Sequence, residues 1–370
     1  MKYVLVLSKE MPNLAAAEAL SLAEAANYKL VKNVLILDIK NNEIIGKLSK
    51  RLAYTSSIYS LLFESSYNDF IKKMESFDWN SIYKGSFCIR ANKMDAINNG
   101  AIKNNAKKFK NKNKHKNKPG INNIRTDEKL YSEKHLAAYV WNSVKNPKVK
   151  LENPKTKIEI FFAGDKAYCC LLLRKSEHAF DERKAHLRPR PNSASLQPKL
   201  ARALINLTGA KEGEAVLDPF CGSGGILIEA GLMGLRTIGY DLSRKMVWGA
   251  MVNLRHYAIE NSELKAKDFF KLNGKYSYVA ADLPYGLNAS IMENIRVTSS
   301  NKIRLKKYLD KFYSGVIKKL EKILLKRAVV VFPSYFNYKA AVKKTKLKIT
   351  NEFENYVHSN LTRKIVVLEK

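Results

Sequence analysis

The sequence has few residues that could form a metal site or a disulfide framework. Its four cysteines are Cys88, Cys169, Cys170 and Cys221, and none of them forms a C-x-x-C pair. The six histidines are scattered and never fall at the spacing of metal ligands. This pattern argues against a zinc ribbon and against a disulfide-stabilised scaffold. We therefore expect no structural metal.

Long apolar runs are also absent. No stretch of about 18 apolar residues is present, so the sequence predicts no membrane-spanning helix. The apolar N-terminal stretch, MKYVLVL, is short and soon reaches the charged residues Lys9 and Glu10, which is unlike a signal peptide. We expect a cytoplasmic protein with no membrane partner.

Acidic residues are scarce relative to basic ones. The chain has 370 residues, with 66 Lys and Arg against 34 Asp and Glu, and a net charge of +32. A field of this sign attracts polyanions, and nucleic acid is the commonest such partner. A lysine-rich overall composition, or a surface that is merely solvated, is the alternative explanation. The length favours two or three domains.

The predicted elements divide the chain into four parts. Residues 1–60 read as a small α+β unit, and residues 61–174 as a second region that ends in a β-hairpin at 157–173. Residues 175–194 are charged and contain proline, as expected of an interdomain linker. From 195 to 370 strands and helices alternate, which predicts an α/β fold with a doubly wound, largely parallel sheet. Ligands of that fold bind beyond the carboxyl ends of the strands.

One segment, residues 98–120, differs in composition from the rest. It is rich in Lys and Asn, contains no acid, and has too little apolar content to be buried. It is either a solvated insertion or an arm that contacts RNA phosphates, since lysine suits non-specific phosphate contact. The candidate RNA-binding residues in it are Lys107, Lys108, Lys110, Lys112, Lys114, Lys116 and Lys118.

Four acids in the second half of the chain follow apolar runs at or near predicted strand ends. They are Asp218, Asp241, Asp268 and Asp282. A single Asp in such a place is usually a turn former or a helix cap. Four in successive β-α units should line one rim of the sheet. Their carboxylates could accept hydrogen bonds from the ribose hydroxyls and the amine of an adenosine-containing ligand.

The stretch LDPFCGSGG places Gly222 and Gly224 between a strand and a helix, where glycines allow close approach of a ligand to the backbone. The third position of a G-x-G-x-x-G dinucleotide loop would be Leu227, not glycine. The carboxylate of Asp218 would repel a pyrophosphate but could pair with an ammonium group. The pattern therefore favours S-adenosylmethionine over NAD as the cofactor.

The stretch Asp282-Leu283-Pro284-Tyr285 combines an acid, a stiff loop and an aromatic ring. An exocyclic base nitrogen is a weak nucleophile and needs acceptors for its hydrogens. The carboxylate of Asp282 and the carbonyl of Leu283 could supply them. Tyr285 offers a face on which a base can stack, and most of the rate would come from positioning.

Together these motifs resemble Rossmann-fold, S-adenosylmethionine-dependent amino-methyltransferases, and most closely the archaeal-type tRNA guanine-10 N2-methyltransferases. The resemblance rests on VLDPFCGSGGILIEAGLMG, GYDLSRKMVWGAMVNLRHY, DLPYG, SLQPKLARALINL and the C-terminal YVHSNLTRKIVVL. The first half, through SFCIRANK and the 157–173 hairpin, resembles a ferredoxin-like domain (1–60) followed by a THUMP RNA-binding domain (61–174).

The resemblance implies methylation of the N2 amine of guanosine 10 in tRNA, once or twice, and assigns roles to single residues. Asp218, Gly222 and Gly224 would contact the methionine part of the cofactor, Asp241 the ribose, and Asp268 with Phe269 the adenine side. Ser195 would lie near the cofactor as well. Asp282, Leu283, Pro284 and Tyr285 would form the catalytic loop. A small activating protein subunit is not excluded.

The sequence departs from the family pattern at Leu283, where the family has proline. Leucine keeps the backbone carbonyl but loses the fixed φ of proline, so the loop could be less rigid. Two alternatives to the main prediction therefore stay open. One is a sister tRNA guanine N2-methyltransferase that acts at another position, and the other is a tRNA-binding protein with an impaired catalytic loop.

Overall fold

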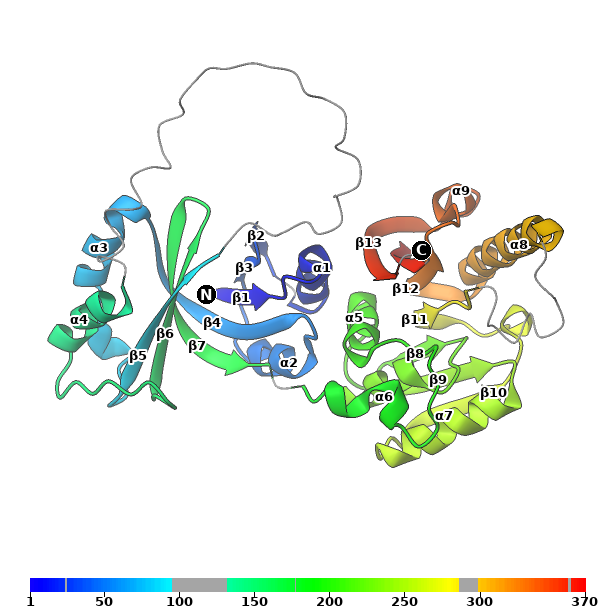
Figure 1. The fold of residues 1–370 in the computed structure, drawn as a ribbon, viewed down its shortest axis with the longest axis horizontal. Coiled ribbons are helices and arrows are strands. Elements are labelled where there is room, and N and C mark those ends of the chain that lie inside the picture. The colour runs from blue at the N-terminus through cyan, green and yellow to red at the C-terminus, as the bar shows by residue number, and fades with distance from the viewer. Residues whose placement is uncertain (24, 95–131, 177, 286–298, 359–360) are drawn as a thin grey trace, which may run out of the picture. The chain divides into compact units, whose positions relative to one another are not determined.

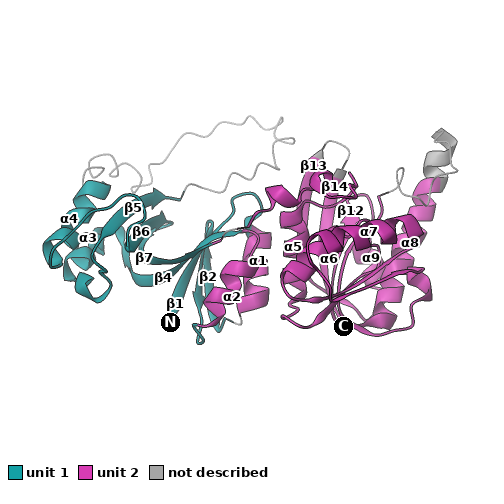
Figure 2. Cartoon of the chain, turned by 90° about the horizontal axis from the view of Figure 1, so that it is seen from below, with its two compact units in different colours: residues 1–12, 25–42, 55–175 teal, residues 13–24, 43–54, 176–370 magenta. Residues whose placement is uncertain are grey.

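The computed structural model describes residues 1–23, 25–94, 132–176, 178–285, 299–358 and 361–370. The chain forms two compact units, which Figure 2 shows in two colours. Unit 1 contains residues 1–12, 25–42 and 55–175, and unit 2 contains residues 13–24, 43–54 and 176–370. The predicted α/β class is confirmed, because each unit has its own sheet with helices packed on it.

Unit 1 is built on one seven-stranded sheet in the order β2-β3-β1-β4-β7-β6-β5. The long strand β4 pairs antiparallel with β1 on one side and with β7 on the other. Residue 60, the predicted boundary between two N-terminal domains, lies within β4, and that division stays a prediction. The elements, labelled in Figure 1, are β1 (Lys2–Leu7), β2 (Asn27–Val31), β3 (Val34–Asp38), β4 (Thr55–Ser66), α3 (Tyr67–Ser76), β5 (Phe87–Lys93), α4 (Glu133–Ser143), β6 (Thr156–Ala163) and β7 (Lys166–Lys175).

Helices α3 and α4 bury their apolar sides against β5, β6 and β7. Phe70 of α3 and Leu136 of α4 share a cluster with Phe87 and Ile158 of the strands. Both helices start at a serine whose side chain accepts a backbone N–H. Trp141 of α4 does not join this core, since it is 46% exposed. A pattern of apolar residues cannot tell which aromatic on a short helix meets the sheet.

Unit 2 is built on a second seven-stranded sheet in the order β10-β9-β8-β11-β12-β14-β13. Strands β10, β9, β8, β11 and β12 run parallel, and β14 and β13 follow antiparallel. The elements are α1 (Pro12–Ala23, with Pro12 itself in unit 1), α2 (Ile44–Arg51), α5 (Pro198–Thr208), β8 (Ala215–Asp218), α6 (Gly225–Leu232), β9 (Arg236–Asp241), α7 (Arg244–His256), β10 (Ser262–Ala266), β11 (Tyr276–Asp282), α8 (Ser299–Ile323), β12 (Leu324–Pro333), α9 (Tyr338–Val342), β13 (Lys348–His358) and β14 (Leu361–Glu369).

The central strands of this sheet are buried on both faces, as parallel strands covered by helices must be. Alternate residues of β11 such as Val279 and Ala281 pack with Tyr313 and Ile317 of α8. Elsewhere α6 and α7 form a separate cluster that includes Leu227 of α6. Because helices cover the faces of the sheet, a ligand site in this fold lies at the carboxyl ends of its strands.

Helices α1 and α2 come from the first 54 residues but belong to unit 2. The fully buried carboxylate of Glu18 accepts hydrogen bonds from Ala53 N (2.8 Å), Tyr54 N (3.0 Å) and Asn206 Nδ2 (2.7 Å). Arg51 of α2 donates to Asn206 Oδ1 through Nε (3.2 Å) and Nη2 (3.0 Å). Burial raises the pKa of Glu18, and these donors act in the opposite direction. A polar cluster thus joins both helices to α5.

The segment predicted as a linker packs within unit 2 from residue 178 onward. It forms two short 3-10 helices, Asp181–Arg183 and Ala185–Leu187. Arg183 Nε lies 2.8 Å from Glu229 Oε1, and Arg202 Nε lies 2.8 Å from Glu229 Oε2. The two arginines neutralise a glutamate of α6 that is completely buried.

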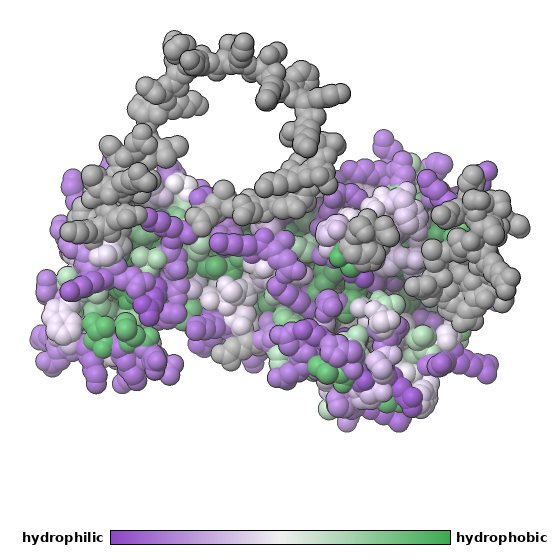
Figure 3. All heavy atoms as spheres, viewed as in Figure 1, coloured by the Kyte–Doolittle hydropathy of each residue, from purple (hydrophilic) through white to green (hydrophobic). Residues whose placement is uncertain are grey.

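Hydrophilic residues dominate the face drawn in Figure 3. No helix in the described part of the chain is long and apolar enough to cross a membrane. Among the described residues no three His, Cys, Asp or Glu side chains are grouped as metal ligands would be. All four cysteines are buried and unbridged.

Candidate active site

The four predicted acids lie along the carboxyl edge of the unit 2 sheet. The neighbouring parallel strands β9, β8 and β11 end at Asp241, Asp218 and Asp282. Asp268 follows β10, the next strand outward, and the amide of Lys267 beside it donates to the Asp241 carbonyl (2.9 Å). Parallel strands bring their ends to one edge, so the rim predicted from sequence is present.

Asp218 is the most deeply buried of these acids, with 2% of its surface exposed. Burial raises its pKa well above the usual range, the Phe220 backbone N–H lowers it, and the carboxylates of Asp282 and Asp241 raise it further. A buried carboxyl whose pKa is raised by two neighbouring carboxylates favours a positively charged group beside it. This arrangement matches an ammonium or sulfonium ligand.

The glycine loop turns tightly between β8 and α6. Gly222 and Gly224 have φ of +50° and +88°, a region that side chains with a Cβ enter at a cost. A Cβ on Gly224 would also lie 2.9 Å from Leu254 Cδ1. The Gly222 N–H donates to Asp241 Oδ2 (3.0 Å), so the loop is tied to the next strand end.

The carboxylates of Asp241 and Asp268 accept hydrogen bonds from backbone amides and can accept further hydrogen bonds from a ligand. Asp241 accepts from Gly222 N and from Ser243 N (2.9 Å), which leaves further lone pairs for a diol. Asp268 accepts from Phe270 N (2.9 Å). The ring of Phe269 is 2% exposed and packs 5.1 Å from the Phe220 ring. Its predicted contact with adenine stays a prediction.

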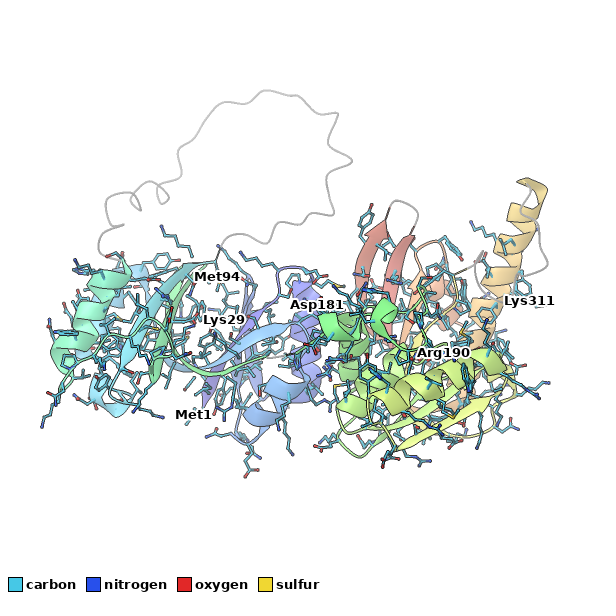
Figure 4. All side chains as sticks on the ribbon, turned by 60° about the horizontal axis from the view of Figure 1, so that its bottom comes forward. Met1, Lys29, Met94, Asp181, Arg190 and Lys311 are labelled. Atoms are coloured by element: carbon cyan, nitrogen blue, oxygen red, sulfur yellow. The ribbon has the colours of Figure 1, made fainter. Side chains whose placement is uncertain are left out.

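Ser195 lies beside the glycine loop, at the end of the segment that precedes α5. Its Oγ is 3.1 Å from Ser223 Oγ. The same segment is clamped by Asn253 of α7, whose Nδ2 donates to the carbonyls of Arg190 and Ser223 (both 2.9 Å). Arg190 Cζ sits 3.9 Å from the Trp248 ring centroid, and Figure 4 labels this arginine beside α7. Sequence reasoning missed Asn253, because nothing distinguishes a polar residue within a helical pattern.

The loop after β11 is held from both sides. The Tyr285 hydroxyl donates a hydrogen bond to Asp282 Oδ1. The Leu283 side chain is 1% exposed in the core, and its N–H donates to Val331 O (3.3 Å). The Tyr313 hydroxyl of α8 donates to the Pro284 carbonyl (2.8 Å). Packing and hydrogen bonds therefore restrain this loop where the family proline is missing.

Arg363 of β14 adds a positive charge to this loop. Its Cζ lies 5.6 Å from the Tyr285 ring centroid, and its Nε is buried without an acceptor among the described residues. Burial raises the pKa of Asp282 to about 6, and the charge of Arg363 and the Tyr285 hydrogen bond both lower it. Sequence reasoning missed this role of Arg363, because Arg363 is 81 residues from Asp282 and the two meet only through the pairing of strands in the sheet.

Two full-length relatives decide the family. A tRNA (guanine(10)-N2)-dimethyltransferase of Methanothermobacter thermautotrophicus is 30% identical over 383 aligned residues, covering 100% of both chains. A protein of the same name from Pyrococcus abyssi is 30% identical, covering 100% of this chain and 99% of its own. The chain belongs to the tRNA (guanine(10)-N2)-dimethyltransferase family.

Two family models and a solved structure give further similarities. A family model described as RMKL-like, methyltransferase domain, matches residues 185–365, and a model described as DNA methylase matches residues 39–251. The second model ends before β11 and so does not reach the Asp282 loop. The crystal structure of TrmN from Thermus thermophilus superimposes with a TM-score of 0.50 at 17% identity, with 100% of each chain covered. It shows that the two chains share a fold.

One group of predicted site residues cannot be placed in this family member. Lys107, Lys108, Lys110, Lys112, Lys114, Lys116 and Lys118 lie outside the described residues. Their contact with RNA stays a prediction.

Proposed function

We propose that the chain methylates the exocyclic N2 amine of guanosine 10 in tRNA, with S-adenosylmethionine as methyl donor, and forms N2-methyl- and N2,N2-dimethylguanosine. The observation that carries the proposal is the full-length similarity to two proteins of that named activity. The acidic rim, the glycine loop and the Asp282 loop supply matching chemistry at one edge of the sheet.

The residues at this edge fit the proposed cofactor. The left-handed glycines leave no Cβ where the loop must approach a ligand, and Asp241 keeps lone pairs suited to a ribose diol. Asp218 would face the ammonium group, whose charge would offset the clustered carboxylates. When bound, the cofactor supplies an electrophilic methyl group on a sulfonium. Ser195, Asp268 and Phe269 would complete the site as the family resemblance implies.

The Asp282 loop would bind and orient the amine. An ionised Asp282 and the carbonyl of Leu283 would accept its two hydrogens and so favour a nitrogen lone pair that is free to react. Because the Tyr285 hydroxyl holds Asp282 Oδ1 in this structure, the amine would use Oδ2 or displace the tyrosine. The Tyr285 ring would then stack on the base. The rate would come mainly from this positioning.

The rest of the chain would bind the remainder of the tRNA. We infer that unit 1 serves as a THUMP-type RNA-binding region and that the Lys-rich segment 98–120 contacts phosphates. The net charge of +32 supports both assignments. Action in the cytoplasm is part of the same proposal, and a small activating protein subunit is compatible with it.

Nucleoside mass spectrometry of tRNA incubated with the protein and S-adenosylmethionine tests the function. We expect both methylated guanosines, and none when guanosine 10 is replaced by adenosine in the transcript. Unchanged transfer to that transcript would assign the protein to a sister enzyme of another position. The Asp282→Ala variant should lose transfer and keep cofactor binding, whereas loss of both would make Asp282 a structural residue.

A further inference from the structure

A groove of about 370 Å³ lies between helices α8 and α9 of unit 2, both of which are labelled in Figure 1. The two helices meet through the buried core, where Tyr313 and Ile317 of α8 share a cluster with Tyr338 and Val342 of α9. We call the groove beside this contact the α8–α9 groove. The polar and aromatic side chains of its lining that matter below are Lys306, Asp310, Ser314, Lys318, Tyr335 and Lys344.

The lining of the α8–α9 groove is mainly positive. Lys306, Lys318 and Lys344 are exposed, and none of the three side chains forms an ion pair within the described part of the chain. Asp310 is the acid of the described lining, so the three lysines outnumber the negative charge. Lysines that have no counter-charge from the protein itself attract a polyanion.

The groove begins at the same edge of the sheet as the candidate active site. Helix α8 connects the parallel strands β11 and β12, so it starts near the carboxyl ends of the strands and ends near their amino ends. Tyr335 follows the carboxyl end of β12, and its hydroxyl lies 3.2 Å from the Tyr313 hydroxyl. The Tyr313 hydroxyl donates to the Pro284 carbonyl (2.8 Å). A ligand in the groove would therefore lie beside the Asp282 loop.

The length of the groove favours a nucleic-acid strand over a small anion. Lys306 and Lys318 are 12 positions apart on α8, which separates them by about 18 Å along the helix axis. A single phosphate cannot reach both lysines. A stacked strand that rises about 3.4 Å per nucleotide covers this distance with about five nucleotides.

The uncharged side chains of the groove suit the same ligand. The Tyr335 side chain is 47% exposed, so its ring can contact a base or a ribose. The hydroxyl of Ser314 can donate a hydrogen bond to a phosphate oxygen. Basic side chains next to an accessible aromatic ring are typical of grooves that bind single-stranded nucleic acid.

We propose that the α8–α9 groove binds the sugar–phosphate backbone of the substrate RNA next to the nucleotide that is methylated. This inference rests on the proposed function, because it takes RNA as the substrate. It adds a contact within unit 2 to those predicted for unit 1 and for the segment 98–120. The groove orients the RNA locally, so that the target base can enter the site at the Asp282 loop.

A triple variant of the full chain, Lys306→Gln with Lys318→Gln and Lys344→Gln, tests the groove. Binding of unmodified tRNA, measured between 50 and 200 mM salt, gives the affinity and its dependence on salt. We expect weaker binding, and a slope of log K against log salt that is smaller in magnitude by about 2 to 3, at about 0.7 to 0.9 for each lost contact. The KM for tRNA should rise, while kcat at saturating tRNA should change little, because these lysines do not touch the reacting groups.

The matched control is the triple variant Lys211→Gln with Lys275→Gln and Lys322→Gln, which removes the same charge from exposed positions. These lysines precede β8, β11 and β12, so they lie near the amino ends of the strands, at the opposite edge of the sheet. The control should keep the KM and the salt slope of the wild-type protein. Equal effects of the two triple variants, or no effect of the groove variant, would overturn the proposal.

Cross-linking tests where the strand lies. All four native cysteines are buried, so Lys344→Cys supplies an exposed thiol for a photoreactive probe. The cross-links should fall within a few nucleotides of guanosine 10, and cross-links confined to a distant part of the tRNA would overturn the proposal. Neither binding nor cross-linking requires methyl transfer. A wild-type protein that cross-links in this way and transfers no methyl group would count against the proposed function and not against the groove.

Discussion

At the scale of single residues, two opposing effects set the pKa of Asp282, namely burial and the groups beside it. Burial raises its pKa to about 6, and Arg363 and Tyr285 limit the rise. Asp218 and Tyr313 also lie near enough to interact with its charge. The proposed chemistry needs the ionised carboxylate, which is present above the raised pKa and lost as the pH falls through it. Methyl transfer should therefore decline below about pH 6.

Removing the positive charge of Arg363 should move this decline to higher pH. The Arg363→Met variant lacks the charge that lowers the pKa of Asp282, so this pKa rises and the acid limb of kcat/KM shifts to higher pH. A pH profile of kcat/KM between 5 and 9 measures the shift. Arg363→Lys keeps a cation there and should restore most of the wild-type profile. A limb that stays in place in Arg363→Met would show that the arginine does not act on Asp282.

Leucine at position 283 should stabilise the folded protein more than the proline of the family pattern would. Its N–H extends the pairing of β11 with β12, and its side chain fills the core. Leu283→Pro loses that hydrogen bond and apolar volume, so we expect unfolding to become easier by about 1–3 kcal/mol or more. Leu283→Ala keeps the N–H and isolates the cost of the cavity, about 2–5 kcal/mol. Denaturant titration measures both, and a gain of transfer in Leu283→Pro would contradict this reading and indicate an impaired loop.

The four acids were predictable as residues, whereas the positions of Arg363 and Arg188 in unit 2 were not. An acid after an apolar run, as in Asp218 or Asp282, is local information, and parallel pairing brings such ends together by rule. Arg363 meets Asp282 only because β14 inserts antiparallel beside β12. Arg188 looked like part of a charged linker, since nothing in the local pattern shows that its side chain turns inward.

At the scale of elements, the turn from β8 into α6 depends on two left-handed glycines. The Gly224→Ala substitution puts an alanine in a left-handed conformation with φ of +88°, and it also places a Cβ 2.9 Å from Leu254 Cδ1. Gly213 is a matched control, because its φ is +83° and a Cβ there meets nothing within 4 Å. Both variants should lose about 1–2 kcal/mol of stability from the left-handed conformation, and Gly224→Ala should lose more and also bind S-adenosylhomocysteine more weakly. Equal behaviour of the two variants in unfolding and in calorimetry would show that the contact with α7 does not matter.

The alternation of strands and helices from residue 195 onward was predictable from the sequence. The membership of α1 and α2 in unit 2 was not predictable. Alternating strands and helices from 195 onward predicted the doubly wound sheet, and β13 and β14 complete it as antiparallel strands. Helices α1 and α2 carry no local sign of belonging to unit 2. They are placed by Glu18 and Arg51 meeting Asn206, a contact that depends on tertiary structure alone.

At the scale of the whole molecule, the positive charge should control tRNA binding. Replacing the seven candidate lysines between 107 and 118 by Asn should weaken tRNA binding and flatten its dependence on salt, since fewer counterions are released. Affinity measured between 50 and 200 mM salt gives the slope. The slope would stay the same if that segment were a solvated bystander. Replacing seven exposed lysines elsewhere controls for net charge.

The Glu18 cluster should contribute strongly to the stability of unit 2. In Glu18→Gln the new amide N–H group faces a backbone donor, Ala53 N or Tyr54 N, so at least one buried donor loses its acceptor. The expected loss is about 1–3 kcal/mol. Glu260→Gln, at an exposed position, is the control. Thermal unfolding should show a lower midpoint for the first variant only, and an unchanged midpoint would mean that a neutral side chain suffices there.

The same cluster has a consequence for how the protein is made. Glu18 and Asn206 are 188 residues apart, so a ribosome that adds about 5–20 residues per second takes about 10–40 s to go from one to the other. During that interval α1 has left the ribosome, but the amide that its buried carboxylate requires has not been synthesised. The first helix of the nascent chain is therefore among the last to reach its final environment, and the catalytic unit cannot be completed before most of the protein has been translated.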